Sequence, residues 1–158
     1  MRGGKLLHMP YITMPPPGPA RKGLFEWDEF EKVRDLLTRE PLADIATMAY
    51  CTGWRTPSEI LPLEWSQVDR ERGTIKLEAE MTKTNEPRLF PYKMLPELAA
   101  AVERRWKAKE ALAGKDIISP YVFFRFSATA KQARRVKSFW KVWETACENA
   151  GSPDKDAA

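Results

Sequence analysis

The sequence predicts an α+β fold that is mainly α, with several helices around one small antiparallel β-sheet. Apolar residues recur at helical spacing through most of the chain, whereas residues 74–78 alternate as a half-buried strand does. Hydrophobic residues make up 43% and charged residues 30% of the 158 residues, which is typical of a globular chain with its own core. We therefore expect one domain, over residues 24–151.

Two segments lie outside that domain. Residues 1–23 read as an arm or linker, because their prolines exclude a helix and favour an extended polyproline conformation. These prolines are Pro10, Pro15, Pro16, Pro17 and Pro19. Residues 152–158 are small and polar, and we expect them to form a disordered tail.

The first half of the domain contains three predicted helices. Residues 26–39 place apolar side chains at helical spacing, namely Phe30, Val33, Leu36 and Leu37. Residues 42–52 repeat the pattern, and Gly53 ends that helix because glycine tolerates the left-handed conformation. Residues 57–65 form the third helix, which Pro62 should kink. Its core positions are Ile60, Leu61 and Leu63.

Arg55 lies in the elbow between the second and third helices. Thr56 is a suitable N-cap, Pro57 suits the first helical position, and Glu59 can complete a capping box. A guanidinium held in such an elbow can bind a phosphate, because its fork of N–H donors matches the phosphate oxygens. The alternative is a loop arginine paired with a nearby carboxylate such as Glu59.

The predicted sheet follows the third helix. A turn over residues 69–73 leads into a strand over residues 74–78. Residues 84–86 then form a hairpin tip, flanked by Met81-Thr82-Lys83 on one side and Arg88-Leu89-Phe90 on the other. Lys83 would lie at the mouth of this tip.

The second half of the domain returns to helices. Residues 95–113 form a long helix with Leu98, Val102 and Trp106 on one side, ended by Gly114. Residues 121–124 form a short buried strand or turn. Residues 137–150 form an amphipathic helix that Gly151 ends. Its inward residues are Phe139, Trp140, Trp143, Ala146 and Cys147.

The charges are unevenly placed. Net charge is +4, and between Arg104 and Lys141 many bases are accompanied only by Glu110 and Asp116. Such a cluster indicates either a polyanionic partner or a solvated surface, and the charge alone does not separate the two.

Three classes of protein are disfavoured by the composition. No apolar run approaches the ~20 residues that span a bilayer, and no signal-peptide pattern opens the chain, so we expect a cytoplasmic protein without a membrane partner. Cys51 and Cys147 sit in apolar helical patterns, as small buried hydrophobes do, and not as a disulfide. With His8 as the one histidine, we expect no metal site.

Two blocks of the sequence resemble the tyrosine recombinases, the phage integrase family. Residues 50–55, Tyr-Cys-Thr-Gly-Trp-Arg, followed by residues 58–69 resemble the first box of that family. Residues 82–91 resemble its β-hairpin with the catalytic lysine. The resemblance covers about residues 24–150 and implies the catalytic-domain fold, incomplete at the C-terminus.

The resemblance also implies a chemistry. In this family a tyrosine attacks the scissile DNA phosphate and forms a phosphotyrosyl link, without cofactor or metal. Arg55 would neutralise charge on the phosphate, Lys83 would protonate the leaving hydroxyl, and Glu59 would support the arginine. The implied partners would be double-stranded DNA and further recombinase subunits. Further DNA-binding candidates are Arg88, Arg134, Arg135 and Lys137.

Two features depart from the family pattern. Glu59 lies four positions after Arg55 where three is commoner, which implies one extra residue in the elbow. No His-x-x-Arg box and no later nucleophilic tyrosine follow the last helix. We therefore expect a recombination protein that binds DNA but is inactive by itself. Two alternatives remain open: a non-catalytic DNA-binding or regulatory protein acting at recombination sites, and a poorly folded decay product.

Overall fold

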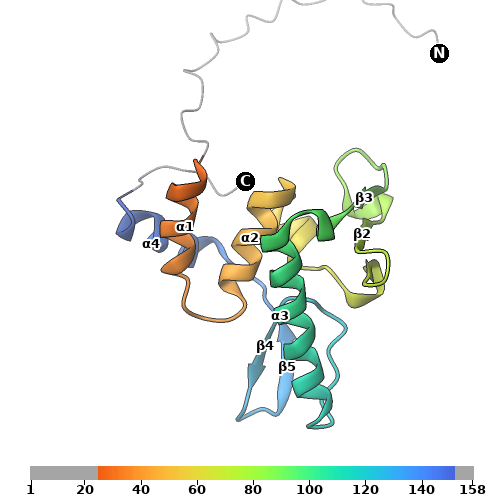
Figure 1. The fold of residues 1–158 in the computed structure, drawn as a ribbon. Coiled ribbons are helices and arrows are strands. Elements are labelled where there is room, and N and C mark those ends of the chain that lie inside the picture. Colours follow the sequence, from red (N-terminus) through yellow and green to blue (C-terminus); the bar gives the residue numbers. More distant parts are fainter. Residues whose placement is uncertain (1–24, 152–158) are drawn as a thin grey trace, which may run out of the picture.

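The computed structural model describes residues 25–151, so the expected arm and tail lie outside the described residues. It confirms a mainly helical chain with small antiparallel sheets. The longer helices are α1 (Trp27–Asp35), α2 (Leu42–Thr52), α3 (Pro96–Ala113) and α4 (Trp140–Asn149). Figure 1 shows α1 beside α4, and α2 against the upper part of α3. No helix among residues 25–151 is long and apolar enough to cross a membrane.

One hydrophobic core joins these helices to the sheet. Val33, Ile45, Leu63 and Leu98 are fully inaccessible, and they come from segments far apart in the sequence. Burying a side chain of this size contributes about 1.5–3 kcal/mol. The predicted core positions Ile60, Leu61 and Leu63 are all buried.

The prediction that Leu36 and Trp140 lie in the core is wrong. Leu36 is 47% exposed and Trp140 is 48% exposed. In both cases the helix is shorter than predicted: Leu36 follows the last residue of α1, and Trp140 is the first residue of α4. At a helix end the chain turns away from the packed face, so periodicity no longer fixes which way a side chain points.

The central sheet has the order β1-β2-β3, with β1 at Val68–Asp69, β2 at Thr74–Leu77 and β3 at Arg88–Phe90. Both pairings are antiparallel, and β2 pairs with β3 through Ile75–Phe90 and Leu77–Arg88. The prediction that residues 81–83 pair with residues 88–90 across the hairpin tip is wrong, because β3 pairs with β2 instead. The intervening chain forms a short 3-10 turn at Ala79–Met81 and a loop that carries Lys83.

A second sheet was not predicted. Strands β4 (Phe124–Ser127) and β5 (Gln132–Arg135) form an antiparallel hairpin whose tip lies beside the C-terminal end of α3 (Figure 1). Only its first residues carry the apolar run that indicated a strand. Phe124-Arg125-Phe126-Ser127 alternates over four residues only, and Gln132, Arg134 and Arg135 of β5 are polar or basic and exposed, so the signal for a half-buried hairpin is weak.

Candidate functional site

The elbow after α2 is built by one glycine and one buried tryptophan. Gly53 has φ 64° and donates its N–H to the carbonyl of Ala49 at 2.9 Å, which ends the helix as predicted. A Cβ at Gly53 would meet nothing within 4 Å, so the left-handed backbone conformation is what favours glycine there. Trp54 is 3% exposed and anchors the next step of the chain in the core. Arg55, which follows, is exposed.

The turn after Arg55 is a π-helical turn, Thr56–Ile60. The N–H of Ile60 donates to the carbonyl of Arg55 at 3.2 Å, and the N–H of Leu61 donates to that of Thr56 at 2.9 Å. A π turn holds one residue more than an α turn. It therefore accommodates the extra residue that the spacing between Arg55 and Glu59 implies.

The predicted start and length of this helix were wrong. Arg55, not Thr56, is the N-cap, and Pro57 takes the second helical position instead of the first. The regular turn ends at Ile60, before Pro62, so no kink forms. Proline cannot donate the hydrogen bond that would have continued the helix.

Glu59 holds the backbone of Arg55. Its side chain is buried, and Oε2 accepts the N–H of Arg55 at 2.8 Å. The other oxygen, Oε1, lies 3.8 Å from a guanidinium nitrogen of Arg88 on β3. Among residues 25–151 the Arg55 guanidinium itself forms no ion pair with a carboxylate. The alternative of an Arg55–Glu59 side-chain pair is therefore not what the structure has.

The elbow and the sheet are packed together. Trp54 meets the ring of Phe90 edge-on, with centroids 5.7 Å apart. The contact between Glu59 and Arg88 joins the same two segments of the chain. The structure thus brings together Arg55, Glu59 and Arg88, from the elbow and from β3.

Lys83 lies in the loop between β2 and β3 and is exposed. The preceding residue fixes the loop: the Thr82 hydroxyl donates to the carbonyl of Glu86 at 2.8 Å and accepts the N–H of Glu86 at 3.2 Å. Within the described chain Lys83 forms no ion pair. Its ammonium group is therefore not neutralised by the domain itself.

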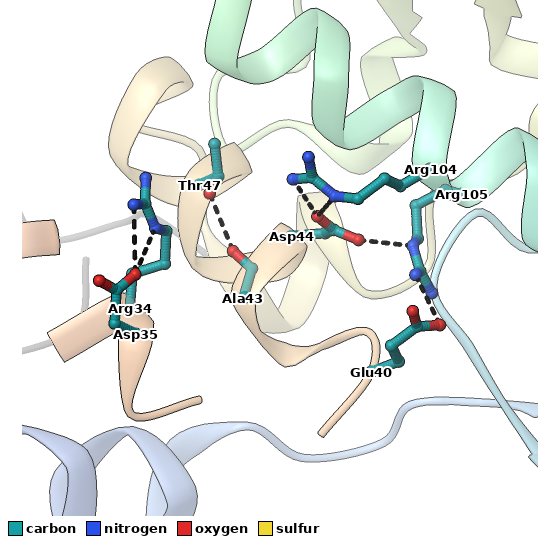
Figure 2. Close-up of polar contacts among 8 residues, drawn as sticks. All are labelled: Arg34, Asp35, Glu40, Ala43, Asp44, Thr47, Arg104 and Arg105. Atoms are coloured by element: carbon teal, nitrogen blue, oxygen red, sulfur yellow. Dashed lines mark hydrogen bonds and ion pairs between the residues drawn. The ribbon is translucent and has the colours of Figure 1, made fainter. Parts of the chain in front are cut away.

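The basic region from Arg104 to Lys141 is divided by the fold. Asp44 on α2 is buried and binds two arginines of α3 (Figure 2). Its Oδ1 accepts from Arg104 at 2.9 and 2.6 Å, and its Oδ2 pairs with Arg105 at 2.6 Å. Arg105 is 2% exposed and also pairs with Glu40 at 2.9 Å. Both arginines therefore join α3 to α2 through Asp44; Arg105 is withdrawn from solvent, whereas the Arg104 side chain remains 53% exposed.

Other bases of the region lie over aromatic rings. Lys109 is 4.3 Å from the Trp106 centroid, and Arg135 is 5.8 Å from that of Tyr121. Arg134 donates twice to the Oε1 of Gln132, at 3.2 and 3.0 Å. Lys137 is exposed. Of the predicted DNA-binding residues, Arg134, Arg135 and Lys137 therefore belong to or follow β5, whereas Arg88 lies on β3 and approaches Glu59.

Among residues 25–151, neither the cysteines nor the metal-ligating side chains form a further site. Cys147 is buried as predicted, but Cys51 is only half-buried, and neither forms a disulfide. Burial, with a smaller contribution from Glu97, raises the pKa of the Cys51 thiol. No group of three or more metal-ligating side chains occurs among residues 25–151.

The tyrosines of the described chain have structural roles. Tyr50 stacks on Phe30 at 4.3 Å and donates to the carbonyl of Phe25 at 3.1 Å, and it remains 38% exposed. Tyr92 is buried, and burial raises its pKa. A buried or stacked phenol is poorly placed to attack a substrate.

One open depression of about 500 Å³ lies beside the N-terminal half of α2. Its lining includes Arg34, Glu40, Asp44, Glu97 and Arg104. None of the elbow or loop residues lines it, so this depression is separate from the candidate site.

A family profile and one solved structure are similar to this chain. A sequence profile described as the phage integrase family matches residues 29–156. The fold is similar to that of a solved structure titled "Crystal structure of XerA recombinase", with a TM-score of 0.61 and 16% sequence identity. The match covers 87% of this chain and 47% of that chain, so this chain spans about half the length of that relative. Comparison with curated proteins gives no match.

Proposed function

The chain belongs to the phage integrase family, and we propose that its elbow is the phosphate-binding half of a DNA recombination site. In this proposal Arg55 and Lys83 contact a phosphate of double-stranded DNA, while Glu59 positions Arg55. Arg88 on β3, whose guanidinium lies 3.8 Å from Glu59 Oε1, would contact a neighbouring phosphate. The chain binds DNA in this way but does not cleave it by itself.

The state of Arg55 is the observation that carries the proposal. Its backbone is held by a buried carboxylate at 2.8 Å, while its guanidinium is exposed and has no carboxylate partner within the described chain. A fixed backbone lowers the entropy lost when the guanidinium closes on an anion. An un-neutralised fork of donors suits the tetrahedral oxygens of a phosphate. Lys83, also exposed and without an ion-pair partner among residues 25–151, would supply a second charge from the loop between β2 and β3.

The absence of cleavage is proposed from the sequence. The 158 residues contain no His-x-x-Arg, and the tyrosines within residues 25–151 precede α4. In a tyrosine recombinase the covalent step needs a phenol oxygen in line with the scissile phosphate. Arg55 and Lys83 can stabilise charge on that phosphate, but they cannot replace the nucleophile.

Binding is tested with a fluorescent duplex of random sequence, titrated at several salt concentrations. We expect wild-type affinity to fall steeply with salt, and the Arg55→Ala/Lys83→Ala variant to bind about tenfold or more weakly at ~0.1 M salt, because it loses two phosphate contacts. Lys32→Ala/Arg72→Ala is the control, since it removes the same charge from exposed sites on α1 and on the turn before β2. If both variants bind equally, the elbow is not the phosphate site.

Cleavage is tested with nicked duplexes drawn from a random-sequence pool. We expect no covalent protein–DNA adduct on a denaturing gel. An adduct that resists denaturation would overturn the proposal of inactivity. Cooperative thermal unfolding of the same sample shows that the negative result comes from a folded protein and also argues against a decay product.

A second candidate is a non-catalytic DNA-binding or regulatory protein acting at recombination sites. The exposed bases on the β4–β5 hairpin favour it, because they lie outside the elbow. The same titration separates the two: a regulatory protein would keep its affinity when Arg55 and Lys83 are replaced.

A further inference from the structure

The β4–β5 hairpin has two unlike faces. Successive residues of a strand point to opposite sides, and paired residues share a side. Phe124, which is buried, and Phe126, whose ring lies 5.5 Å from the Lys115 ammonium, share one side. The other side carries Arg125, Ser127, Gln132 and Arg134, all exposed. On the first side Phe124 is buried while Phe126 remains 39% exposed, and the second side faces solvent.

On the outer face two arginines stand directly opposite each other. Arg125 of β4 pairs in register with Arg134 of β5. Like charges in this position repel and destabilise the sheet. No carboxylate close in sequence can offset this repulsion, since residues 117–143 contain neither aspartate nor glutamate. Arg125 forms no ion pair within the described chain.

The neighbouring residues hold this charge in place. Gln132 accepts two hydrogen bonds from Arg134, at 3.2 and 3.0 Å, which orients the guanidinium without cancelling its charge. Lys131, at the tip, has φ 46°, a conformation that glycine would adopt more easily. The hairpin thus keeps an additional base at a strained position.

The register also separates the predicted DNA-binding residues. Arg134 and Arg135 are adjacent in sequence but lie on opposite faces of β5. Arg135 lies over the ring of Tyr121, on the side of the body. The residue that shares a face with Arg134 is Arg125, which sequence reasoning did not single out.

We propose that the outer face of the β4–β5 hairpin is a second contact surface for duplex DNA, in which Arg125 and Arg134 together bind one backbone phosphate. An anion between the two guanidinium groups relieves their repulsion, and each fork of donors can bind its oxygens. A two-stranded ribbon is also narrow enough to follow a groove of DNA. The contact is to the backbone, so it is independent of base sequence. This inference rests on the proposed DNA binding and adds a surface to it.

The test uses the full chain, a random-sequence duplex and an unrelated duplex of equal length. The variant Arg125→Ala/Arg134→Ala loses one phosphate contact, so we expect about tenfold weaker binding at ~0.1 M salt. The slope of log affinity against log salt should become shallower by about one unit. Both duplexes should show the same change. The thermal unfolding temperature should not fall, because the substitution removes a repulsion.

Two further variants keep the inference open to refutation. Arg125→Lys/Arg134→Lys preserves the charge, so it should retain most of the salt slope while losing the affinity that comes from the paired donors. Lys32→Ala/Arg72→Ala removes equal charge elsewhere and should bind like wild type. A hairpin variant with wild-type affinity and slope would overturn the inference, and so would a loss confined to one of the two duplexes.

Failure here differs from failure of the proposed function. If wild-type protein shows no salt-dependent binding to either duplex, the proposed DNA binding itself is wrong. If wild-type protein binds, and only the elbow variant is weakened, the elbow proposal holds and the hairpin surface is rejected.

Discussion

Arginines have opposite environments in the two halves of the basic region, α3 and the β4–β5 hairpin. On α3, Arg104 and Arg105 meet the buried carboxylate of Asp44 at 2.6 Å, and Arg105 is 2% exposed. On the β4–β5 hairpin, Arg125 and Arg134 meet each other across the sheet and are exposed. The first pair therefore joins helices, while the second carries charge that the domain does not neutralise.

This difference shows how a basic sequence should be interpreted. A count of bases between Arg104 and Lys141 treats all of them as one electrostatic surface. Pairing energies instead depend on the partner and on burial: a buried charge must be paired, whereas an exposed one is solvated at little cost. Asp44→Asn and Arg125→Glu test the contrast between the two regions, and two further predictions concern Glu59 in the elbow and the Cys51 thiol on α2.

The largest effect should come from Asp44→Asn. This change leaves Arg105 buried without its charged partner on α2, and we expect a loss of about 3–5 kcal/mol in the free energy of unfolding. Urea unfolding followed by tryptophan fluorescence measures it. Glu40→Gln removes the other partner of Arg105, but the Glu40 side chain is 76% exposed, so its cost should stay below about 1 kcal/mol. Equal losses in the two variants would contradict the assignment of Asp44 as the buried half of the network.

A smaller effect is expected from Glu59→Ala. The Arg55 N–H loses its acceptor at 2.8 Å, and we expect a loss of about 1–2 kcal/mol together with weaker DNA binding. Ser58→Ala, on an exposed neighbour in the same turn, should change stability by no more than about 0.5 kcal/mol. Loss of stability with unchanged DNA affinity would show that Glu59 supports the fold and not the position of Arg55.

Substitution in the exposed region should act in the reverse direction. Arg125→Glu creates an opposite-charge pair with Arg134, so we expect the chain to gain about 0.5 kcal/mol of stability. The gain should shrink at high salt, because exposed charges are screened. Thermal unfolding at low and high salt measures it, with Arg125→Gln as the control that removes repulsion without adding attraction. A lower unfolding temperature at low salt would mean that Arg125 has a stabilising partner in the folded domain.

The smallest effect concerns the thiol of Cys51. Burial raises its pKa, with a smaller contribution from the Glu97 carboxylate. Because the thiolate is the reactive form, alkylation should be slower at mildly alkaline pH than for an exposed cysteine, and its pH profile should be shifted upward. The measurement is the iodoacetamide rate against pH in a Cys147→Ala background. Glu97→Gln should lower the pKa slightly. A profile unchanged by this substitution, and equal to that of a free thiol, would contradict the burial of Cys51.

Much of the fold could be predicted because its signals are local. Helical periodicity marked the four longer helices, and Gly53 ended α2 as expected. Prediction failed where the signal extended past a helix end, as at Leu36 and Trp140. It also failed for the β4–β5 hairpin, whose apolar face is limited to Phe124 and Phe126 on β4 and whose second strand is mostly polar or basic.

The candidate site divides in the same way. The chain alone indicated Arg55, Glu59 and Lys83, because capping residues and the two family-like blocks are read along the sequence. It could not show that Glu59 accepts from the backbone of Arg55, or that Arg88 approaches that carboxylate from β3. The π turn that accommodates the extra residue is also a product of the fold.

The sequence by itself determined the order of the helices, the glycine elbow and the presence of many bases late in the chain. Only the tertiary structure decided which of those bases face solvent. Asp44 lies sixty positions before Arg104, and no local pattern connects them. The register of β4 and β5 likewise opposes Arg125 to Arg134. The physical reason is that backbone conformation depends on near neighbours, whereas the environment of a charge depends on whatever the folded chain brings within a few ångströms.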